Sequence, residues 1–186
     1  MLVMPLLHAQ TAVDCSHTLP PKENVTCIKQ KYERMIKKWP DTIGRANKLI
    51  KDGDVYFKKK NYFKAFKAYD LAYSNMPNAY SYLRKGDVIF LSIATEPDFR
   101  DENGKSTGAC LLPSEFVWTV ERGVMSGYQT GIELYKILKA GPPVSDAMLA
   151  DAQKKSQCLT ALAHQYRQVK TGCVDLAKVR TCMGIL

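Results

Sequence analysis

The chain has 186 residues, of which 46% are hydrophobic and 24% are charged, as expected for a soluble globular domain with a sizeable core. No stretch approaches the roughly 20 apolar residues of a membrane helix, so the sequence excludes a membrane-spanning protein. The net charge of +9 is concentrated, because residues 28–67 hold 13 lysines and arginines against four acids. The rest of the chain has 14 of each sign.

The first ten residues resemble the end of a bacterial export signal. Met1 to Leu7 is apolar and His8-Ala9-Gln10 precedes polar sequence, although the basic leader region of such signals is missing. We therefore expect residues 1–10 to be an export signal remnant, residues 11–186 to form a single helical domain, and the protein to be periplasmic. The alternative is an ordinary apolar N-terminal tail.

The chain contains six cysteines, an even number that fits three disulfides in an exported protein. No pair has the C-x-x-C spacing of zinc or redox sites, and the three histidines lack metal-ligand spacing, so we expect no metal and no cofactor. Spacing alone does not fix one of 15 pairings. Local geometry favours Cys15–Cys27 across a proline turn and Cys158–Cys182 between two C-terminal helices, which leaves Cys110–Cys173.

Three helices are predicted in the first part of the chain. Apolar residues recur at helical spacing over residues 24–39, and the proline that follows ends this helix because it lacks an amide hydrogen. A second helix is expected after Asp41, its cap, and runs to about Lys59. A third is opened by Asn61 and ends before Pro77.

Two stretches of nine residues are similar to each other. LIKDGDVYF at 49–57 recurs as YLRKGDVIF at 82–90, a displacement of 33 residues that is typical of stacked helical pairs. Residues 46–79 resemble a tetratricopeptide repeat, and the likeness continues to about residue 90. The packing positions of that repeat are occupied here by Leu49, Gly53, Tyr56, Ala65, Tyr69, Ala72 and Pro77.

This resemblance implies a partner-binding surface. In such repeats the first helix of each pair faces a concave groove that can hold a peptide or a protein loop. The residues of this predicted concave face are Asn47, Ile50, Asp54, Phe57, Tyr80, Leu83, Asp87 and Phe90, of which Asp54, Phe57, Asp87 and Phe90 are expected to bind a partner. The alternative is that Phe57 and Phe90 simply pack on the helices that follow.

The segment at 95–113, TEPDFRDENGKSTGACLLP, stands where the second unit should have its partner helix. Loops this long are uncommon in compact domains and are usually functional or disordered. A disulfide at Cys110 would anchor its base and lower the entropy lost on binding. The residues that could enter the cleft of a partner are Glu96, Asp98, Phe99, Arg100, Asp101 and Glu102. The alternative is a solvated connection without a partner.

A long helix is predicted to follow, with Ser114 as its cap. Its glycines at 123, 127 and 131 lie on one stripe, which indicates a groove where another helix of the same chain packs closely. The alternative is the seam of a homodimer.

The C-terminal part is also helical. After a turn at 140–145, Ser145 caps a helix that runs towards Lys170, Gly172 ends it, and a short final helix follows. No strand is predicted. The expected fold is all-α, made of antiparallel helix pairs with a tetratricopeptide-like N-terminal half, long C-terminal helices and disulfide bracing.

Catalysis and nucleic-acid binding are disfavoured. No nucleophile, base or metal set is mutually supported, and an even cysteine count favours disulfides over a dyad with His164, so we expect no enzyme. Lysines 58–60 beside aromatic residues could bind nucleic acid, but Tyr56 and Tyr69 are assigned to packing, and export separates the chain from nucleic acid. These lysines would then form a solvated face or one that attracts an acidic protein or an anionic polymer.

The chain as a whole resembles the periplasmic immunity proteins that neutralise amidase effectors of type VI secretion, through "LLHAQTAVDC" and its helical body. The resemblance implies a non-enzymatic protein that inhibits a secreted peptidoglycan amidase by occluding its cleft. The alternatives are a tetratricopeptide-like envelope adaptor that binds a peptide in the concave face, and a binder of anionic polymers.

Overall fold

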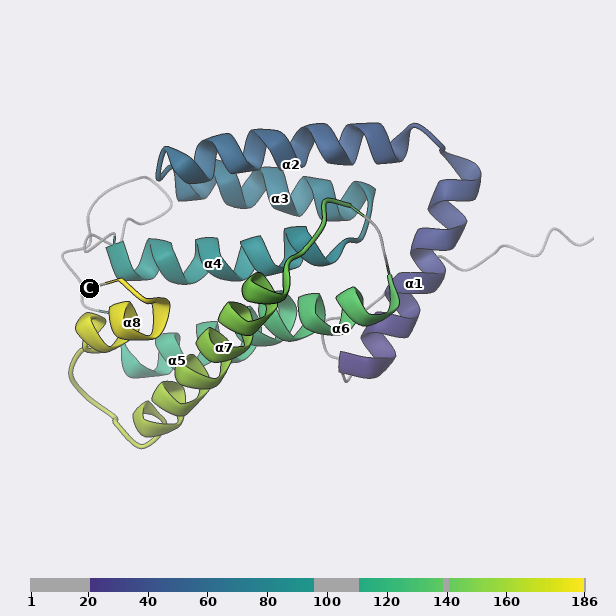
Figure 1. The fold of residues 1–186 in the computed structure, drawn as a ribbon. Helices are drawn as coiled ribbons and strands as arrows, with labels where there is room; N and C mark the ends of the chain where they lie inside the picture. Colours follow the sequence, from purple (N-terminus) through teal and green to yellow (C-terminus); the bar gives the residue numbers. More distant parts are fainter. Residues whose placement is uncertain (1–20, 96–110, 139–140, 186) are drawn as a thin grey trace, which may run out of the picture.

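The computed structural model describes residues 21–95, 111–138 and 141–185, and every regular element in these ranges is a helix. The all-α prediction is therefore confirmed for the described residues. Figure 1 shows the arrangement, with α2, α3 and α4 lying side by side and α5 to α8 packed below them. The elements are α1 (Pro21–Lys38), α2 (Thr42–Lys58), α3 (Tyr62–Asn75), α4 (Ala79–Thr95), α5 (Pro113–Gly123), the π-helix η1 (Val124–Gln129), α6 (Thr130–Ile137), α7 (Asp146–Tyr166) and α8 (Leu176–Met183).

Local signals set several helix ends as predicted. The Asn61 side chain caps α3 by accepting a hydrogen bond from the backbone N–H of Lys64 at 3.2 Å, and Ser145 caps α7 through Met148 at 3.1 Å. The expected cap at Ser114 is wrong, because α5 already begins at Pro113. Proline suits the first helical position, since its fixed φ is helical and its missing N–H would have no partner there.

The aromatic residues of α2 and α3 lie mainly between helices. Tyr69 and Ala65 are fully buried, while Tyr56 is half-buried with the Lys64 ammonium 5.7 Å from its ring centroid. The packing role predicted for Tyr69 and Ala65 is therefore confirmed. The lysines of residues 58–60 are exposed at the turn between the two helices.

The glycine stripe packs against α4 of the same chain, as predicted. A Cβ added to Gly127 would lie 2.9 Å from the Cα of Gly86, so the two backbones are almost in contact. Gly123 lies against the ring of Phe90, and Gly131 lies against the side chain and backbone nitrogen of Leu83. Only glycine allows an approach this close along the whole crossing.

One contact between a tyrosine and a glycine occurs twice in the fold. The Tyr69 ring on α3 lies against Gly53 of α2, and the Tyr128 ring on η1 lies against Gly86 of α4. On α4, the residues that pack against the second glycine come from η1, which follows α5 in the chain. The contact geometry repeats even though the 33-residue spacing does not.

One predicted disulfide is confirmed. Cys158 on α7 and Cys182 on α8 are joined, with an S–S distance of 2.05 Å. Cys27 and Cys173 are disulfide-bonded as well, but their predicted partners Cys15 and Cys110 lie outside the described residues. In the part of the chain that the structure describes, no helix is both long and apolar enough to cross a membrane.

Candidate partner-binding site

The first acidic residue of the predicted concave face holds two tyrosines. One carboxylate oxygen of Asp54 accepts hydrogen bonds from the hydroxyl groups of Tyr69 at 2.7 Å and Tyr80 at 2.8 Å. Burial raises the pKa of Tyr69, and the hydrogen bond to Asp54 adds to this effect. Asp54 therefore links α2, α3 and the start of α4 and is only partly open to a partner.

The second acidic residue is committed to internal contacts. The Asp87 carboxylate accepts hydrogen bonds from the Tyr128 hydroxyl and the Lys155 ammonium, both at 3.0 Å, and lies 3.4 Å from Arg84. Asp151 also binds Lys155, at 2.5 Å. Burial alone would lower the pKa of Lys155, but these two carboxylates outweigh burial and raise it. Asp87 thus joins α4 to η1 and α7.

Arg84 lies between Asp54 and Asp87. It contacts Asp87 directly and Asp54 through the Tyr80 hydroxyl. Its guanidinium lies 4.9 Å from the ring centroid of Phe57 and 5.3 Å from that of Tyr80, and its Nε donates to the Tyr80 hydroxyl at 3.2 Å. The Arg84 side chain keeps 28% of its surface exposed. It is a fixed cation between two aromatic rings, a composition that recurs in the energetically dominant residues of protein interfaces.

The predicted concave face is thus only partly available. Phe90 is fully buried and stacks on Tyr128 with the ring centroids 6.1 Å apart, so the expectation that it contacts a partner is wrong in this conformation. Asp87 is buried too, and its oxygens are occupied. The alternative interpretation, packing on the following helices, holds for Phe90. Asp54 and Phe57 remain half-buried.

The predicted cleft-binding residues Glu96, Asp98, Phe99, Arg100, Asp101 and Glu102 lie outside the described residues, but both flanks of their segment are described. On one side α4 ends at Thr95. On the other side Leu111 is buried, and its carbonyl accepts a hydrogen bond from Val174 at 2.9 Å. The segment is therefore attached to the helical core at both ends.

An exposed tryptophan lies on the helix that follows this segment. Trp118 of α5 is 56% exposed, and the guanidinium of Arg122 lies 4.5 Å from its ring centroid. Glu121 on the same helix pairs with Arg167, which follows α7. Half-exposed tryptophan and arginine are the residue types most enriched among interface hot spots.

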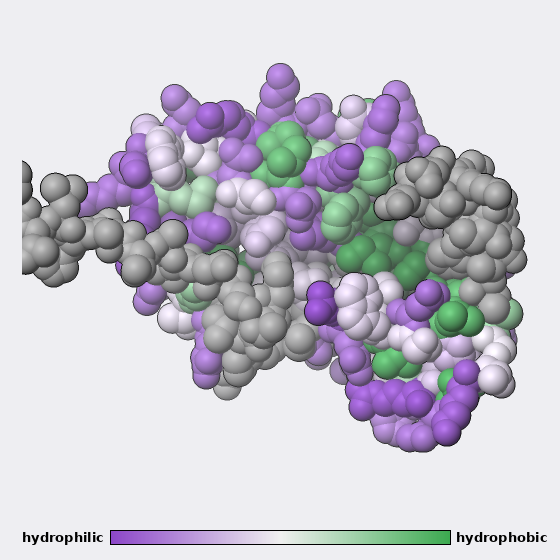
Figure 2. Space-filling view, turned by 180° about the vertical axis from the view of Figure 1, so that it is seen from behind, coloured by the Kyte–Doolittle hydropathy of each residue, from purple (hydrophilic) through white to green (hydrophobic). Residues whose placement is uncertain are grey.

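Two hollows lie at this place, and both are lined by Glu121 and Arg167. The first, of about 310 Å³, is also lined by Trp118, Val117 and Val169. The second, of about 320 Å³, continues between α5, η1 and α7. Figure 2, which shows the back of the molecule, has green, white and purple residues mixed at the lower right, the part that α5 occupies. We call Trp118, Glu121, Arg122, Arg167 and Val169 the Trp118 surface.

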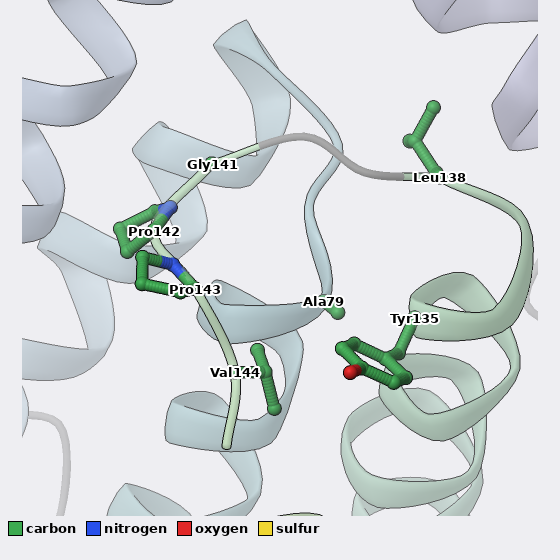
Figure 3. Close-up of a pocket in the computed structure, with 7 residues that line it drawn as sticks. All are labelled: Ala79, Tyr135, Leu138, Gly141, Pro142, Pro143 and Val144. Atoms are coloured by element: carbon green, nitrogen blue, oxygen red, sulfur yellow. The ribbon is translucent and has the colours of Figure 1, made fainter. Parts of the chain in front are cut away.

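A third hollow, of about 330 Å³, lies at the C-terminal end of α6 (Figure 3). The ring of Tyr135 extends from α6 towards Val144, and the chain at 141–144 forms the opposite wall. Gly141 has a φ of +83° and lies against Asn78, so this wall depends on a glycine. The lining contains no charged side chain, which makes it a poorer candidate for oriented binding than the Trp118 surface.

Trp118 and Arg84 were not among the residues predicted to bind a partner. Trp118 lies two positions from both Phe116 and Val120 of the buried stripe, so an outward direction was readable from helical spacing. The role of Arg84 depends on Phe57, which is 27 positions earlier in the chain, and local sequence carries no such signal.

No group of three His, Cys, Asp or Glu side chains in the described ranges is arranged to hold a metal ion. The described cysteines are all in disulfides, so none of them forms a dyad with His164. No protein-family model, curated protein or solved structure matches this chain.

Proposed function

We propose that this chain is a non-catalytic helical protein that binds another protein through the Trp118 surface and the adjoining 95–113 segment. The observation that carries the proposal is the exposed Trp118–Arg122 pair beside two hollows, on a helix anchored in the core. A large aromatic anchor, polar groups around it and a rigid support are the features of an interface centre.

The partner we propose is a secreted peptidoglycan amidase, with the chain acting in the periplasm as its inhibitor. The 95–113 segment carries acidic residues, one arginine and a single aromatic residue, Phe99, which suit insertion into a polar cleft. Its flanks are held by the core, so less freedom is lost on binding. Disulfides such as Cys158–Cys182 are typical of proteins outside the cytosol.

A second candidate function is supported by Arg84. Its guanidinium remains partly exposed between Phe57 and Tyr80, so an adaptor could use it to bind an acidic group of a peptide. The buried state of Asp87 and Phe90 reduces the area of that face, which is why we place it second.

The test is affinity capture with the full-length chain from the native envelope fraction, followed by mass spectrometry of what is retained. We expect a protein that releases peptides from purified peptidoglycan, and that loses this activity when a stoichiometric amount of the chain is added. A retained protein without this activity would contradict the inhibitor proposal and favour the adaptor. Failure to retain any protein would contradict both.

The contribution of the segment is tested by replacing residues 96–109 with a short glycine-serine linker, which leaves Cys110 in place. We expect the captured partner to bind at least tenfold more weakly. Unchanged affinity after the replacement would remove the segment from the interface. Circular dichroism before and after the change shows whether the helical core is retained.

A further inference from the structure

The outer face of α3 combines exposed apolar side chains with lysines. Phe63 is 68% exposed and Leu71 is 52% exposed, and these residues are eight positions apart on one side of the helix. Lys67 lies between them, with its ammonium 4.4 Å from the centroid of the Phe63 ring. Neither apolar side chain belongs to the core clusters of the described residues.

The charge around this face is positive. Lys58, Lys59, Lys60, Lys64 and Lys67 are all exposed, and none of them forms an ion pair with the described acidic residues.

Two nearby acids, Asp70 and Asp54, are engaged by other groups. Asp70 is paired with Lys85 at 2.5 Å, and Asp54 is held by two tyrosines. Figure 2 shows green residues interspersed among purple ones over the upper part of the molecule, where α2 and α3 lie.

We propose that this α3 face (Lys60, Phe63, Lys64, Lys67 and Leu71) binds the surface of an anionic lipid bilayer. The lysines lie near the phosphate groups, and Phe63 and Leu71 enter the boundary between headgroups and acyl chains. Basic residues flanking exposed aromatic and aliphatic side chains on one helix face are the pattern of interfacial membrane helices. This surface is separate from the Trp118 surface and does not depend on the proposed partner.

A soluble polyanion is the less favoured occupant. Such a polymer would use the lysines but would leave Phe63 and Leu71 in water. Base stacking, which could use Phe63, has to compete with Lys67, which already occupies one face of the ring. The two exposed apolar side chains are the observation that favours a bilayer.

The experiment measures binding of the purified full-length chain to phosphatidylglycerol vesicles and to phosphatidylcholine vesicles by flotation. Two variants change the α3 face, one with Lys60, Lys64 and Lys67 replaced by glutamine and one with Phe63→Ser and Leu71→Ser. A control replaces Lys154, Lys170 and Lys178, which are exposed on α7, in the connection that follows it and on α8, by glutamine. Soluble polyphosphate is the competing probe.

We expect binding to phosphatidylglycerol vesicles at low salt and at least tenfold weaker binding to phosphatidylcholine. The α3 lysine variant should bind phosphatidylglycerol vesicles at least tenfold more weakly, because each lysine near an anionic surface contributes about fivefold to the affinity. The control variant should lose less than threefold in the same affinity. The Phe63/Leu71 variant should also lose about tenfold for vesicles while it binds polyphosphate like the wild type.

Three results would overturn the proposal. One is no binding to phosphatidylglycerol vesicles. Another is an equal loss in the control lysine variant, which would indicate diffuse charge. The third is vesicle binding that does not change in the Phe63/Leu71 variant, which would indicate a polyanion surface. Thermal unfolding of each variant shows whether the fold is kept.

Discussion

The ring of Tyr128 lies so close to Gly86 that a Cβ added to this glycine would come within 2.8 Å of it. Its hydroxyl donates to Asp87, the next residue along α4. Tyr69 makes the same two contacts with Gly53 and Asp54 on α2. Each of the two Gly-Asp pairs in the sequence therefore packs against, and accepts a hydrogen bond from, a tyrosine of a later helix.

Alanine at Gly53 is expected to destabilise the fold, because its Cβ would lie 2.6 Å from the Tyr69 ring, which is fully buried and has little room to move. We expect a loss of about 1–3 kcal/mol in the free energy of unfolding, measured by urea denaturation. Gly44→Ala in the same helix is the control, because nothing lies within 4 Å of the added atom. Equal stability of the two variants would show that the Gly53 contact is loose.

Removal of the Asp87 carboxylate should cost more than removal of the Asp54 carboxylate. Asp87→Ala leaves the mostly buried Lys155 with Asp151 as its only described carboxylate partner, and we expect a loss of about 3 kcal/mol. Asp54→Ala removes the acceptor of two tyrosine hydroxyl groups. These hydrogen bonds are more exposed than those of Asp87, so we expect a loss of about 1–2 kcal/mol in the free energy of unfolding. The comparison is made by urea denaturation at neutral pH, and the reverse order would contradict the burial of the Asp87 network.

Stability should fall as the pH rises above 10. Burial raises the pKa of Tyr69, Tyr82 and Tyr128 above the ordinary value of 10.0, so these phenols keep their protons in the folded state and lose them on unfolding. The stabilisation from keeping these protons is complete below pH 10. Above pH 10, each of the three tyrosines lowers the free energy of unfolding by about 1.4 kcal/mol per pH unit.

The tyrosine prediction is checked by urea denaturation between pH 9 and 11, with absorbance at 295 nm recording tyrosinate. Tyr128→Phe should show a shallower decline than the wild type, because one of the titrating groups is gone. Tyrosinate absorbance that reaches half of its full value for all tyrosines near pH 10, without unfolding, would show that these hydroxyl groups are accessible to solvent.

The disulfide between Cys158 and Cys182 is expected to hold α8 on α7. It closes a loop with a sequence separation of 24 residues, for which the chain-entropy estimate is about 3.5 kcal/mol. In the variant with both cysteines replaced by serine, hydrogen exchange should speed up in α8 more than in α2. Equal acceleration in both helices would indicate global rather than local loss of stability.

Local chemistry explains why much of the fold could be predicted. Asn61 and Ser145 cap their helices through neighbours three positions away, and the glycine stripe follows from helical spacing within one element. Ser114 was wrongly predicted as a cap because the neighbouring proline is a better helix start, and the two signals compete within two residues.

Distant pairing explains why the site was predicted less well. Asp54 and Asp87 lie on helices, as predicted. Asp87, however, is bound by Lys155, which is 68 positions away in the chain, and by Tyr128, which is 41 positions away. Local periodicity does not show such partners, so Asp87 and Phe90 were expected at a surface that the fold in fact fills. The hollow beside Trp118 also needs Arg167, which is 49 positions later in the chain, so local sequence does not show it.

The most direct test of partner binding compares the two half-exposed tryptophans. Trp118 and Trp39 each carry a cation over the ring, Arg122 and Lys38, but only Trp118 lines a hollow among those described. The affinity of the captured partner is measured by calorimetry for Trp118→Ala and Trp39→Ala. We expect about a 30-fold loss for Trp118→Ala, typical of an interface hot spot, and less than threefold for Trp39→Ala. Equal affinities in the two variants would contradict the account.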